Sequence, residues 1–299
     1  MKRKKYGAID IGSNAIRLLL VNVFTENKVS TFKKVSLTRV PLRLGEDVFM
    51  DGKISQEKAI DFERTMIAFE QLMKVHKVDQ YRATATSAMR DAANGPAIVE
   101  GVRERTGINI EVITGDEEAK IIRSTHVEER LTAGHDFLYV DVGGGSTEIS
   151  LFVKGDIAAS RSFNIGTIRL LNDQVNEAKW DEMQVWLEEI TKNHKDLEII
   201  GSGGNINKIY KILNKQDWQA INYDELKSVV QELADMTYEQ RIMTYRLHPD
   251  RADVIVHAGL IFQRIMKWTK GAEIHVPKLG LADGLVKSMH GGDLSFKDY

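Results

Sequence analysis

Two segments of the sequence place an aspartate just before a glycine turn, and both carry residue types that can bind phosphate. They are Ala8–Asn14 (AIDIGSN) and Val140–Thr147 (VDVGGGST). In each, an apolar run ending in aspartate leads into glycines and small hydroxyl or amide residues, and a second apolar run follows. An aspartate at a strand end can hold a metal ion or its water, while glycines let successive backbone N–H groups turn toward phosphate oxygens. The repeat therefore predicts a phosphate clamp built from two loops.

The composition suits a protein with a sizeable core and limits its partners. At 299 residues, 42% of them hydrophobic, the chain can form one large domain or two ordinary ones, and the repeated segment favours two. The formal net charge is -2, so no global positive field attracts nucleic acid or a membrane, and we expect neither as a partner. The chain has no cysteine, which excludes disulfides and thiolate ligands and is compatible with a cytoplasmic location.

The first residues need a separate interpretation because they are strongly basic. Met1–Lys5 resembles the start of a signal peptide, but Asp10 and Asn14 interrupt the apolar stretch that would have to follow. We therefore expect a solvated tail. No apolar run approaches the roughly 20 residues of a membrane span.

The first half of the chain alternates between strand and helix patterns. Residues 55–76 start at the N-cap candidate Ser55 and repeat apolar residues at helical spacing, which predicts an amphipathic helix. The other predicted elements are strands at 5–10, 15–24, 29–38, 80–85 and 109–113 and helices at 95–105 and 116–131. A three-stranded meander followed by this alternation indicates an α/β sheet.

The second half repeats the same plan after residue 136. Three strands are predicted at 137–142, 147–153 and 157–163, followed by a strand at 197–200 and helices at 168–175, 180–193, 204–213, 223–235 and 251–269. We place the domain boundary near Ser124, with an N-terminal lobe at 1–124 and a C-terminal lobe at 125–299. The last helix could still pack back on the first lobe.

Several motifs occur in one order along the chain and together resemble those of a known family. They are DIGSN (10–14), ATSAMRD (85–91), GDEEA (115–119), DVGGGSTE (141–148), RAD (251–253) and GLADG (280–284). The set resembles the exopolyphosphatase and guanosine pentaphosphate phosphohydrolase (Ppx/GppA) family of the actin-like ATPase superfamily. The resemblance implies an α/β fold of two actin-like (ribonuclease H-like) lobes, each a mixed five-stranded sheet with helices on both faces. It also implies an active site in the interlobe cleft.

Three acids are candidates for holding a divalent metal. Asp141 ends one strand and Glu148 begins the next, so a hairpin would bring them close, which suits an oxygen-ligated Mg²⁺ that keeps several waters. The alternative for Glu148 is a half-exposed strand residue without a ligand role. Asp10 is the matching acid of the first lobe. The expected cofactor is Mg²⁺, with a monovalent cation as an additional candidate.

The general base is expected on the helix that starts near residue 116. Its first turn holds Asp116, Glu117 and Glu118, and carboxylates there gain from the helix dipole, so a solvated acidic helix start is the alternative. Glu117 and Glu118 point about 100° apart around the helix, so both cannot serve one site. The family resemblance selects Glu118 as the residue that orients and deprotonates the attacking water.

The remaining candidates are phosphate donors. Arg90 follows a strand and small residues and could act as a forked donor, the alternative being an exposed arginine that caps a helix. Further donors are expected from the two glycine turns, namely Ser13, Asn14, Gly143, Gly144, Gly145, Ser146 and Thr147. The resemblance adds substrate contacts by Arg43 and by the glycine turn at Gly203 and Gly204. The family commonly has Thr where this chain has Asn205, and a basic residue within 281–284.

The resemblance implies a metal-dependent exopolyphosphatase that releases orthophosphate from the end of inorganic polyphosphate. The same site would serve the close alternative, hydrolysis of the 5′ γ-phosphate of guanosine pentaphosphate. An actin-like kinase would need a sugar or carboxylate pocket and a nucleoside site, for which the sequence has no signature, and a nucleotide sensor is the non-enzymatic alternative. The family also suggests a homodimer. Longer relatives add C-terminal helical domains that help bind extended polyphosphate, and this chain resembles the short members.

Overall fold

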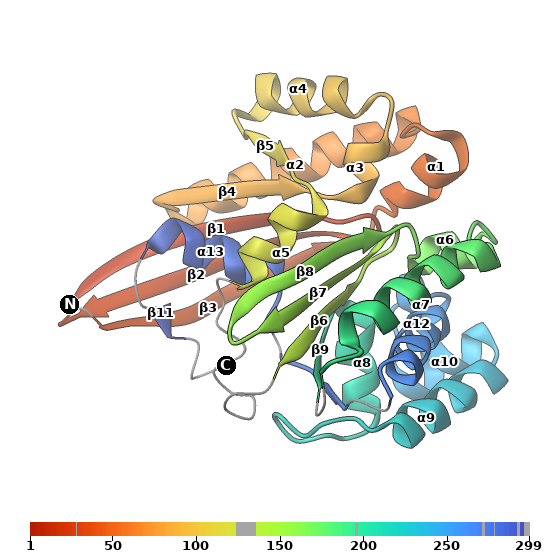
Figure 1. Ribbon diagram of the computed structural model, residues 1–299. Helices are drawn as coiled ribbons and strands as arrows, with labels where there is room; N and C mark the ends of the chain where they lie inside the picture. Colours follow the sequence, from red (N-terminus) through yellow and green to blue (C-terminus); the bar gives the residue numbers. More distant parts are fainter. Residues whose placement is uncertain are drawn as a thin grey trace. The chain divides into compact units, whose positions relative to one another are not determined.

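The computed structural model describes residues 1–27, 29–123, 136–194, 197–270, 273–277, 279–291 and 294–295, and the chain divides into two compact units. Unit 1 contains Met1–His126 together with Leu279–Tyr299, and unit 2 contains Val127–Lys278. Each unit is built on one mixed sheet (Figure 1). Among the described residues, no helix combines the length and apolar character that a membrane span requires.

The sheet of unit 1 has the strand order β11-β3-β2-β1-β4-β5. Its first three strands form the predicted antiparallel meander, β4 and β5 add parallel beside β1, and the two-residue β11 extends the expected five strands at the β3 edge. The bounds are β1 (Lys2–Ile11), β2 (Ile16–Glu26), β3 (Val29–Val40), β4 (Gln80–Ala85), β5 (Ile110–Val112) and β11 (Leu294–Ser295).

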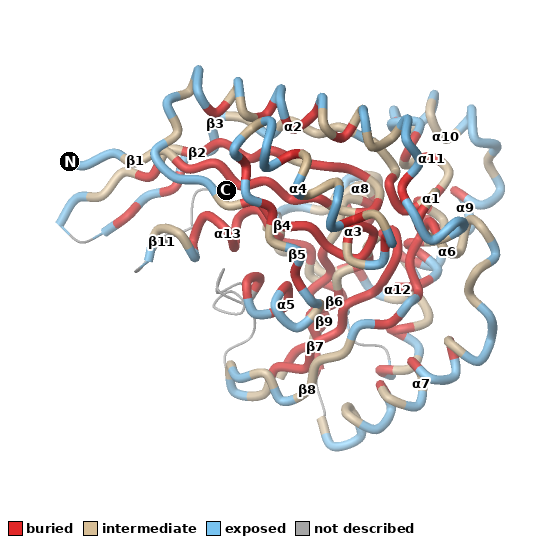
Figure 2. Tube along the Cα trace, turned by 90° about the horizontal axis from the view of Figure 1, so that it is seen from above, coloured by how far each residue is buried: buried red, intermediate tan, exposed pale blue. Residues whose placement is uncertain are grey.

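The basic start of the chain is part of this sheet, so the expectation of a solvated tail was wrong. Lys2 lies opposite Thr25 in the register, and the ladder between β1 and β2 is continuous from there. Backbone pairing with the long β2 strand extends β1 even though its first residues are exposed, as the colouring of Figure 2 shows.

Helices cover both faces of the unit 1 sheet. Successive residues of a strand point to opposite faces. A side chain at Gly7 would lie 2.9 Å from Met73 Sδ of α2, whereas the neighbouring Tyr6 hydroxyl bonds to His290 of α13. α2 and α13 therefore lie on opposite faces, and Asp10 shares the face of Tyr6. The helices are α1 (Leu44–Asp51), α2 (Gln56–His76), α3 (Ser87–Asp91), α4 (Gly95–Thr106), α5 (Gly115–Arg123) and α13 (Leu281–His290).

The sheet of unit 2 repeats this topology in the order β10-β9-β6-β7-β8. The meander is antiparallel, and β9 and β10 run parallel beside β6, as β4 and β5 do beside β1. The strands are β6 (Phe137–Val142), β7 (Thr147–Val153), β8 (Asp156–Phe163), β9 (Glu198–Ser202) and β10 (Ile274–His275). The fold class expected from the sequence, α/β with two mixed sheets, is confirmed.

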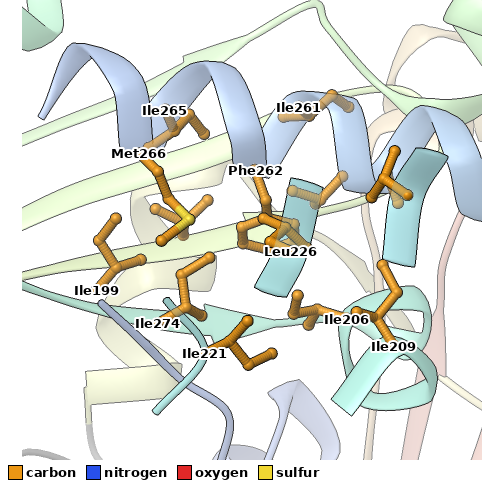
Figure 3. Packing of buried hydrophobic residues seen from close by; sticks show 14 of the residues in the cluster. Ile199, Ile206, Ile209, Ile221, Leu226, Ile261, Phe262, Ile265, Met266 and Ile274 are labelled. Carbon is orange, nitrogen blue, oxygen red and sulfur yellow. The ribbon is translucent and has the colours of Figure 1, made fainter. Parts of the chain in front are cut away.

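The core of unit 2 forms where helices pack on one face of this sheet. Figure 3 shows Phe262 and Met266 of α12 directed at Ile199, Ile221 and Ile274, all of them buried. The helices of this unit are α6 (Thr167–Leu171), α7 (Glu177–Thr191), α8 (Gly204–Ile212), α9 (Tyr223–Asp235), α10 (Tyr238–Tyr245), α11 (Pro249–Ala252) and α12 (Ile255–Trp268).

Several predicted helices have different ends in the structure. The one predicted at 168–175 is α6, which ends early because Asp173 adopts a left-handed conformation with φ 53°. The one predicted at 251–269 is divided into α11 and α12, where the Val254 amide bonds to the Arg251 carbonyl three residues back and tightens the chain. The helix at 116–131 is α5 up to Arg123, and the rest of that prediction lies outside the described residues.

Candidate active site

In the first glycine turn, the aspartate Asp10 is neutralised by an ion pair with Arg17. The Gly12 amide donates to the Ala15 carbonyl at 3.2 Å, which turns the chain from β1 into β2. Asp10 then lies opposite Arg17 in the register, and the Arg17 guanidinium is 2.8 Å from Asp10 Oδ2. Asp10 is buried, so this ion pair satisfies a carboxylate that would be costly to bury alone.

The second glycine turn repeats the backbone of the first with a different charge. The Gly143 amide donates to the Ser146 carbonyl at 2.9 Å, and Asp141 lies directly opposite Glu148. Like charges at opposed positions of two strands repel. This pair therefore fits a cation.

Serine hydroxyls hold the two carboxylates from neighbouring strands. Glu148 Oε1 accepts hydrogen bonds from Ser146 Oγ at 2.6 Å and Ser162 Oγ at 2.9 Å, and Asp141 Oδ2 accepts one from Ser202 Oγ at 3.3 Å. Glu148 is buried at 7% exposure, so the alternative of a half-exposed strand residue was wrong. Within the described ranges, no three acids, histidines or cysteines cluster as a metal site. Two carboxylates still suit Mg²⁺, which commonly uses one or two and keeps water or substrate oxygens as other ligands.

The peptide groups of the second turn are oriented by the start of α6. The amides of Thr167 and Ile168 donate to the carbonyls of Gly143 at 3.0 Å and Gly144 at 2.8 Å, and Arg169 Nε donates to the Gly145 carbonyl at 2.8 Å. In a trans peptide the next N–H points opposite to the carbonyl, and no described peptide is cis. Three successive N–H groups therefore point away from α6, those of Gly144, Gly145 and Ser146. Successive amides that point to one side can bind an anion.

Close packing around this turn explains two further glycines. A side chain at Gly166 would lie 2.4 Å from the Gly144 carbonyl oxygen. Gly203, with φ 114°, would place a side chain 3.0 Å from the Val142 carbonyl oxygen and 3.3 Å from Asp141 Oδ1. Gly203 and Gly204 thus begin α8 beside Asp141, and Thr147 completes the turn by donating its hydroxyl to the Ile165 carbonyl at 2.6 Å.

The polar residues of the first turn are held by two helices that the sequence did not predict, α1 and α3. Ser13 Oγ is 2.9 Å from Ser87 Oγ and accepts the Ala88 amide at 3.2 Å. The Asn14 carbonyl accepts the Arg43 amide at 3.0 Å, and Arg43 stands in a left-handed conformation at the start of α1. The structure therefore brings Arg43 next to Ser13 and Asn14, which stand well before it in the sequence.

Arg90 contacts the chain just before α5. Its guanidinium donates to the Ile113 carbonyl at 3.0 Å and lies 3.7 Å from Asp91 Oδ1. Because Ile113 follows β5 and α5 begins at Gly115, Arg90 lies beside the start of the helix that carries Glu118. It is only partly exposed, unlike the freely exposed arginine of the alternative.

Glu117 and Glu118 have separate roles in α5. Thr114 precedes the helix, and Glu117 Oε2 accepts its amide at 2.8 Å and its hydroxyl at 3.0 Å, while the Glu117 amide donates back to Thr114 Oγ1 at 3.2 Å. This is a capping box, and the hydrogen bonds from the amide and hydroxyl of Thr114 lower the pKa of Glu117. Glu118 is instead buried at 8% exposure. The solvated acidic helix start therefore describes Glu117 and not Glu118.

Three residues of these turns were missed by sequence reasoning. Arg17 stands seven residues after Asp10, and Glu148 stands seven after Asp141, so aligning the two segments would have identified Arg17 as the counterpart of Glu148. Ser162 and Ser202 reach the acids only through strand pairing, which no local pattern reveals.

Comparisons with known proteins were made over the whole chain. The Ppx/GppA phosphatase family model matches residues 22–291. Exopolyphosphatase 2 of Mycobacterium tuberculosis is 27% identical over 97% of this chain and 100% of its own length. Guanosine-5′-triphosphate,3′-diphosphate pyrophosphatase of Photobacterium profundum is 23% identical over 90% of this chain and 53% of its own length.

Solved structures share the fold. An exopolyphosphatase from Cytophaga hutchinsonii superposes with a TM-score of 0.86 at 24% identity, over 97% of this chain and 99% of that one. A Ppx/GppA family member from Aquifex aeolicus gives a TM-score of 0.76 at 23% identity, over 97% and 98% of the two chains. At these identities the likeness concerns the fold alone.

Proposed function

We propose that this chain, which belongs to the Ppx/GppA phosphatase family, is an exopolyphosphatase that hydrolyses the terminal phosphoanhydride bond of inorganic polyphosphate and releases orthophosphate. The second glycine turn is the main observation in favour of this proposal. There, two carboxylates lie opposite each other, beside three amides that point away from α6. Such a turn offers a cation site and an anion site next to each other. The similarity to exopolyphosphatase 2 over nearly the whole chain supports the choice of substrate.

Phosphoryl transfer depends on positioning and on neutralising charge. In this proposal Asp141 and Glu148 hold Mg²⁺, and Asp10 is a further candidate ligand. When bound, the metal would polarise a phosphoryl oxygen and offset its negative charge. The proposed phosphate donors are the amides and side chains of the two turns, from Ser13, Asn14, Gly143, Gly144, Gly145, Ser146 and Thr147, together with Arg90. Arg43, Gly203 and Gly204 are proposed to contact the rest of the substrate.

Glu118 is the proposed general base. A water oxygen attacks the terminal phosphorus while the bridging P–O bond breaks, and Glu118 accepts the proton that the water loses. The shortened polyphosphate leaves with the bridging oxygen and its electron pair. Burial of the Glu118 side chain supports this role, because it separates Glu118 from the solvated acids at the start of the same helix.

Guanosine pentaphosphate is the second candidate substrate. Its terminal 5′ phosphoanhydride presents the same bond, with a nucleotide as the leaving group. The match to the Photobacterium profundum pyrophosphatase favours it as the alternative, although this chain spans about half of that protein.

Phosphate release from long polyphosphate, short polyphosphate, guanosine pentaphosphate and ATP, each with Mg²⁺, tests the proposal. We expect Glu118→Gln to reduce release from the preferred substrate by about 10²- to 10⁴-fold, the usual contribution of a general base. Glu117→Gln is the matched control, because glutamine also completes a capping box and the capping contacts should persist. Equal activity of wild type and Glu118→Gln would contradict the assigned base.

The other outcomes distinguish the remaining functions. Release from guanosine pentaphosphate alone would select the second candidate. Transfer of phosphate from ATP to an acceptor would indicate a kinase, and nucleotide binding without turnover would indicate a sensor.

We also infer that the protein works in the cytoplasm as a homodimer with Mg²⁺ and, in addition, a monovalent cation. The absence of cysteine is compatible with a reducing compartment. Light scattering during size exclusion checks the dimer, and activity after chelation and re-addition of single cations checks the metals.

A further inference from the structure

Gly284 lies where α13 crosses α5 with no room for a side chain. A Cβ there would be 2.4 Å from the Ile121 carbonyl oxygen, 3.0 Å from the Ile121 carbonyl carbon and 2.8 Å from Ile121 Cγ2. Two of these atoms belong to the α5 backbone, so a side-chain rotation cannot relieve the clash. The two helices can therefore approach this closely only because position 284 has no Cβ.

The C-terminal end of α13 is fastened to the sheet by a histidine. One ring nitrogen of His290 lies 2.9 Å from Ser30 Oγ of β3, and the other lies 3.2 Å from the Tyr6 hydroxyl of β1. Burial lowers the pKa of His290. The neutral ring has one donor and one acceptor, which matches two hydroxyl partners.

A second contact fastens α13 to the strands that lead into α5. Arg82 of β4 donates to Ser288 Oγ at 3.2 Å and also pairs with Glu111 of β5, at 2.7 Å to Oε2. Together with His290, this contact holds α13 on the sheet at more than one place. A clash at Gly284 would therefore displace α5 more readily than α13.

α5 depends on this packing for its position. With nine residues it is too short to be stable by itself. Glu118 and Ile121 are three residues apart and so lie on neighbouring positions of one helix side. Both are buried, at 8% exposure each. A shift of α5 at Ile121 would therefore move Glu118 as well.

We propose that Gly284 is a positioning residue for catalysis, because it lets α13 set the place of α5 and thereby of the Glu118 carboxylate. This inference rests on the proposed role of Glu118 as general base. Misplacement of a reacting group by about 1 Å can cost about 10²-fold in rate.

Gly284→Ala tests the proposal, with Gly101→Ala as the matched control. Gly101 also lies inside a helix of unit 1, α4, and a Cβ there meets nothing within 4 Å. We expect Gly284→Ala to lower kcat for polyphosphate about 10- to 100-fold with KM changed less than twofold. Hydrogen exchange of the amides at 115–123 should become faster in this variant alone. Gly101→Ala should leave both kinetic constants and the exchange of α5 unchanged.

A second variant keeps the test decisive if Gly284→Ala does not fold. Ile121→Ala loosens the same contact from the α5 side and should also lower kcat with little change in KM. A folded Gly284→Ala, or a folded Ile121→Ala, with wild-type kcat would overturn the positioning role. If Glu118→Gln is active, the assignment of Glu118 as general base fails first; if it is inactive while Gly284→Ala is fully active, only the positioning role fails.

Discussion

The first and second glycine turns of this protein have the same backbone hydrogen bond but differ in the residue that lies opposite the aspartate. In both, a glycine amide bonds to the carbonyl three residues later, at 3.2 Å in the first and 2.9 Å in the second. Arg17 then faces Asp10, whereas Glu148 faces Asp141. The first turn is therefore closed by its own ion pair, and the second gathers negative charge.

The turn therefore supplies only a geometry, and the residue seven positions after the aspartate decides its chemistry. Buried charges are tolerated when paired or when they bind a metal. The first turn meets this requirement with Arg17, and the second places two carboxylates opposite each other, which suits a cation. We therefore expect the metal at Asp141 and Glu148.

Removing the charge that distinguishes the second turn, with the variant Glu148→Gln, should have the greatest effect. Glu148→Gln keeps the shape and the acceptor for the serine hydroxyls but removes one carboxylate. Because a catalytic metal is worth several kcal/mol of transition-state stabilisation, we expect phosphate release to fall about 10²- to 10⁴-fold. A Mg²⁺ titration of phosphate release measures it, with circular dichroism as the control for folding. Wild-type phosphate release by Glu148→Gln at low Mg²⁺ would contradict a metal site at the second turn.

A smaller effect is expected from Ser146→Ala, which gives the second turn the alanine that the first turn has at this position. Ser146 occupies the place of Ala15, and its hydroxyl holds Glu148 Oε1 at 2.6 Å. We expect Ser146→Ala to weaken Mg²⁺ binding about 10- to 100-fold, as loss of an outer-shell hydrogen bond does. Calorimetric titration with Mg²⁺ measures the change. Ser160→Ala is the control, since Ser160 bonds to Ser150 at 2.9 Å, and equal losses in both variants would contradict the assignment.

Replacing each aspartate by asparagine should have the smallest effect. The free energy of unfolding should rise for the second turn and fall for the first. In metal-free buffer Asp141→Asn removes a repulsion and should raise the free energy of unfolding by about 0.2–1 kcal/mol. Asp10→Asn leaves Arg17 without its charged partner and should lower it by about 1–3 kcal/mol. Urea unfolding followed by circular dichroism measures both.

Added Mg²⁺ sharpens this stability comparison. At about 100 times its Kd, Mg²⁺ should stabilise the wild type by about 2.7 kcal/mol, which places it above Asp141→Asn. The same sign of change for both variants without metal would show that the two turns do not differ as described.

Local patterns were sufficient for most strands and for the long helix. The apolar spacing of Phe62, Met66 and Phe69 predicted α2, and the alternating meanders predicted both sheets. The short helices α1 and α3 were missed because they are held by contacts with the first turn, such as the bond from the Gly45 amide to the Ser13 carbonyl at 2.9 Å. Such contacts join residues that no local window contains together.

Only part of the candidate site could be predicted from the sequence. Motifs named Asp141, Glu148 and Glu118, while the capping box that occupies Glu117 follows from the spacing of Thr114 and Glu117 and was overlooked. The roles of these residues remain predictions. The hydrogen bond from Ser162 to Glu148 depends on the pairing of β7 with β8, and so on the register.

By itself, the sequence determined that two similar lobes would form and that each would carry an aspartate at a glycine turn, because apolar periodicity and glycine placement act over a few residues. Only the tertiary structure decided that Ser162 and Ser202 donate to the two carboxylates of the second turn, and that Gly284 packs against the helix of Glu118. The hydrogen-bond donors around a carboxylate depend on which strands lie beside it, and the room for a side chain depends on which helix crosses there. Both are set by contacts between segments distant in the chain.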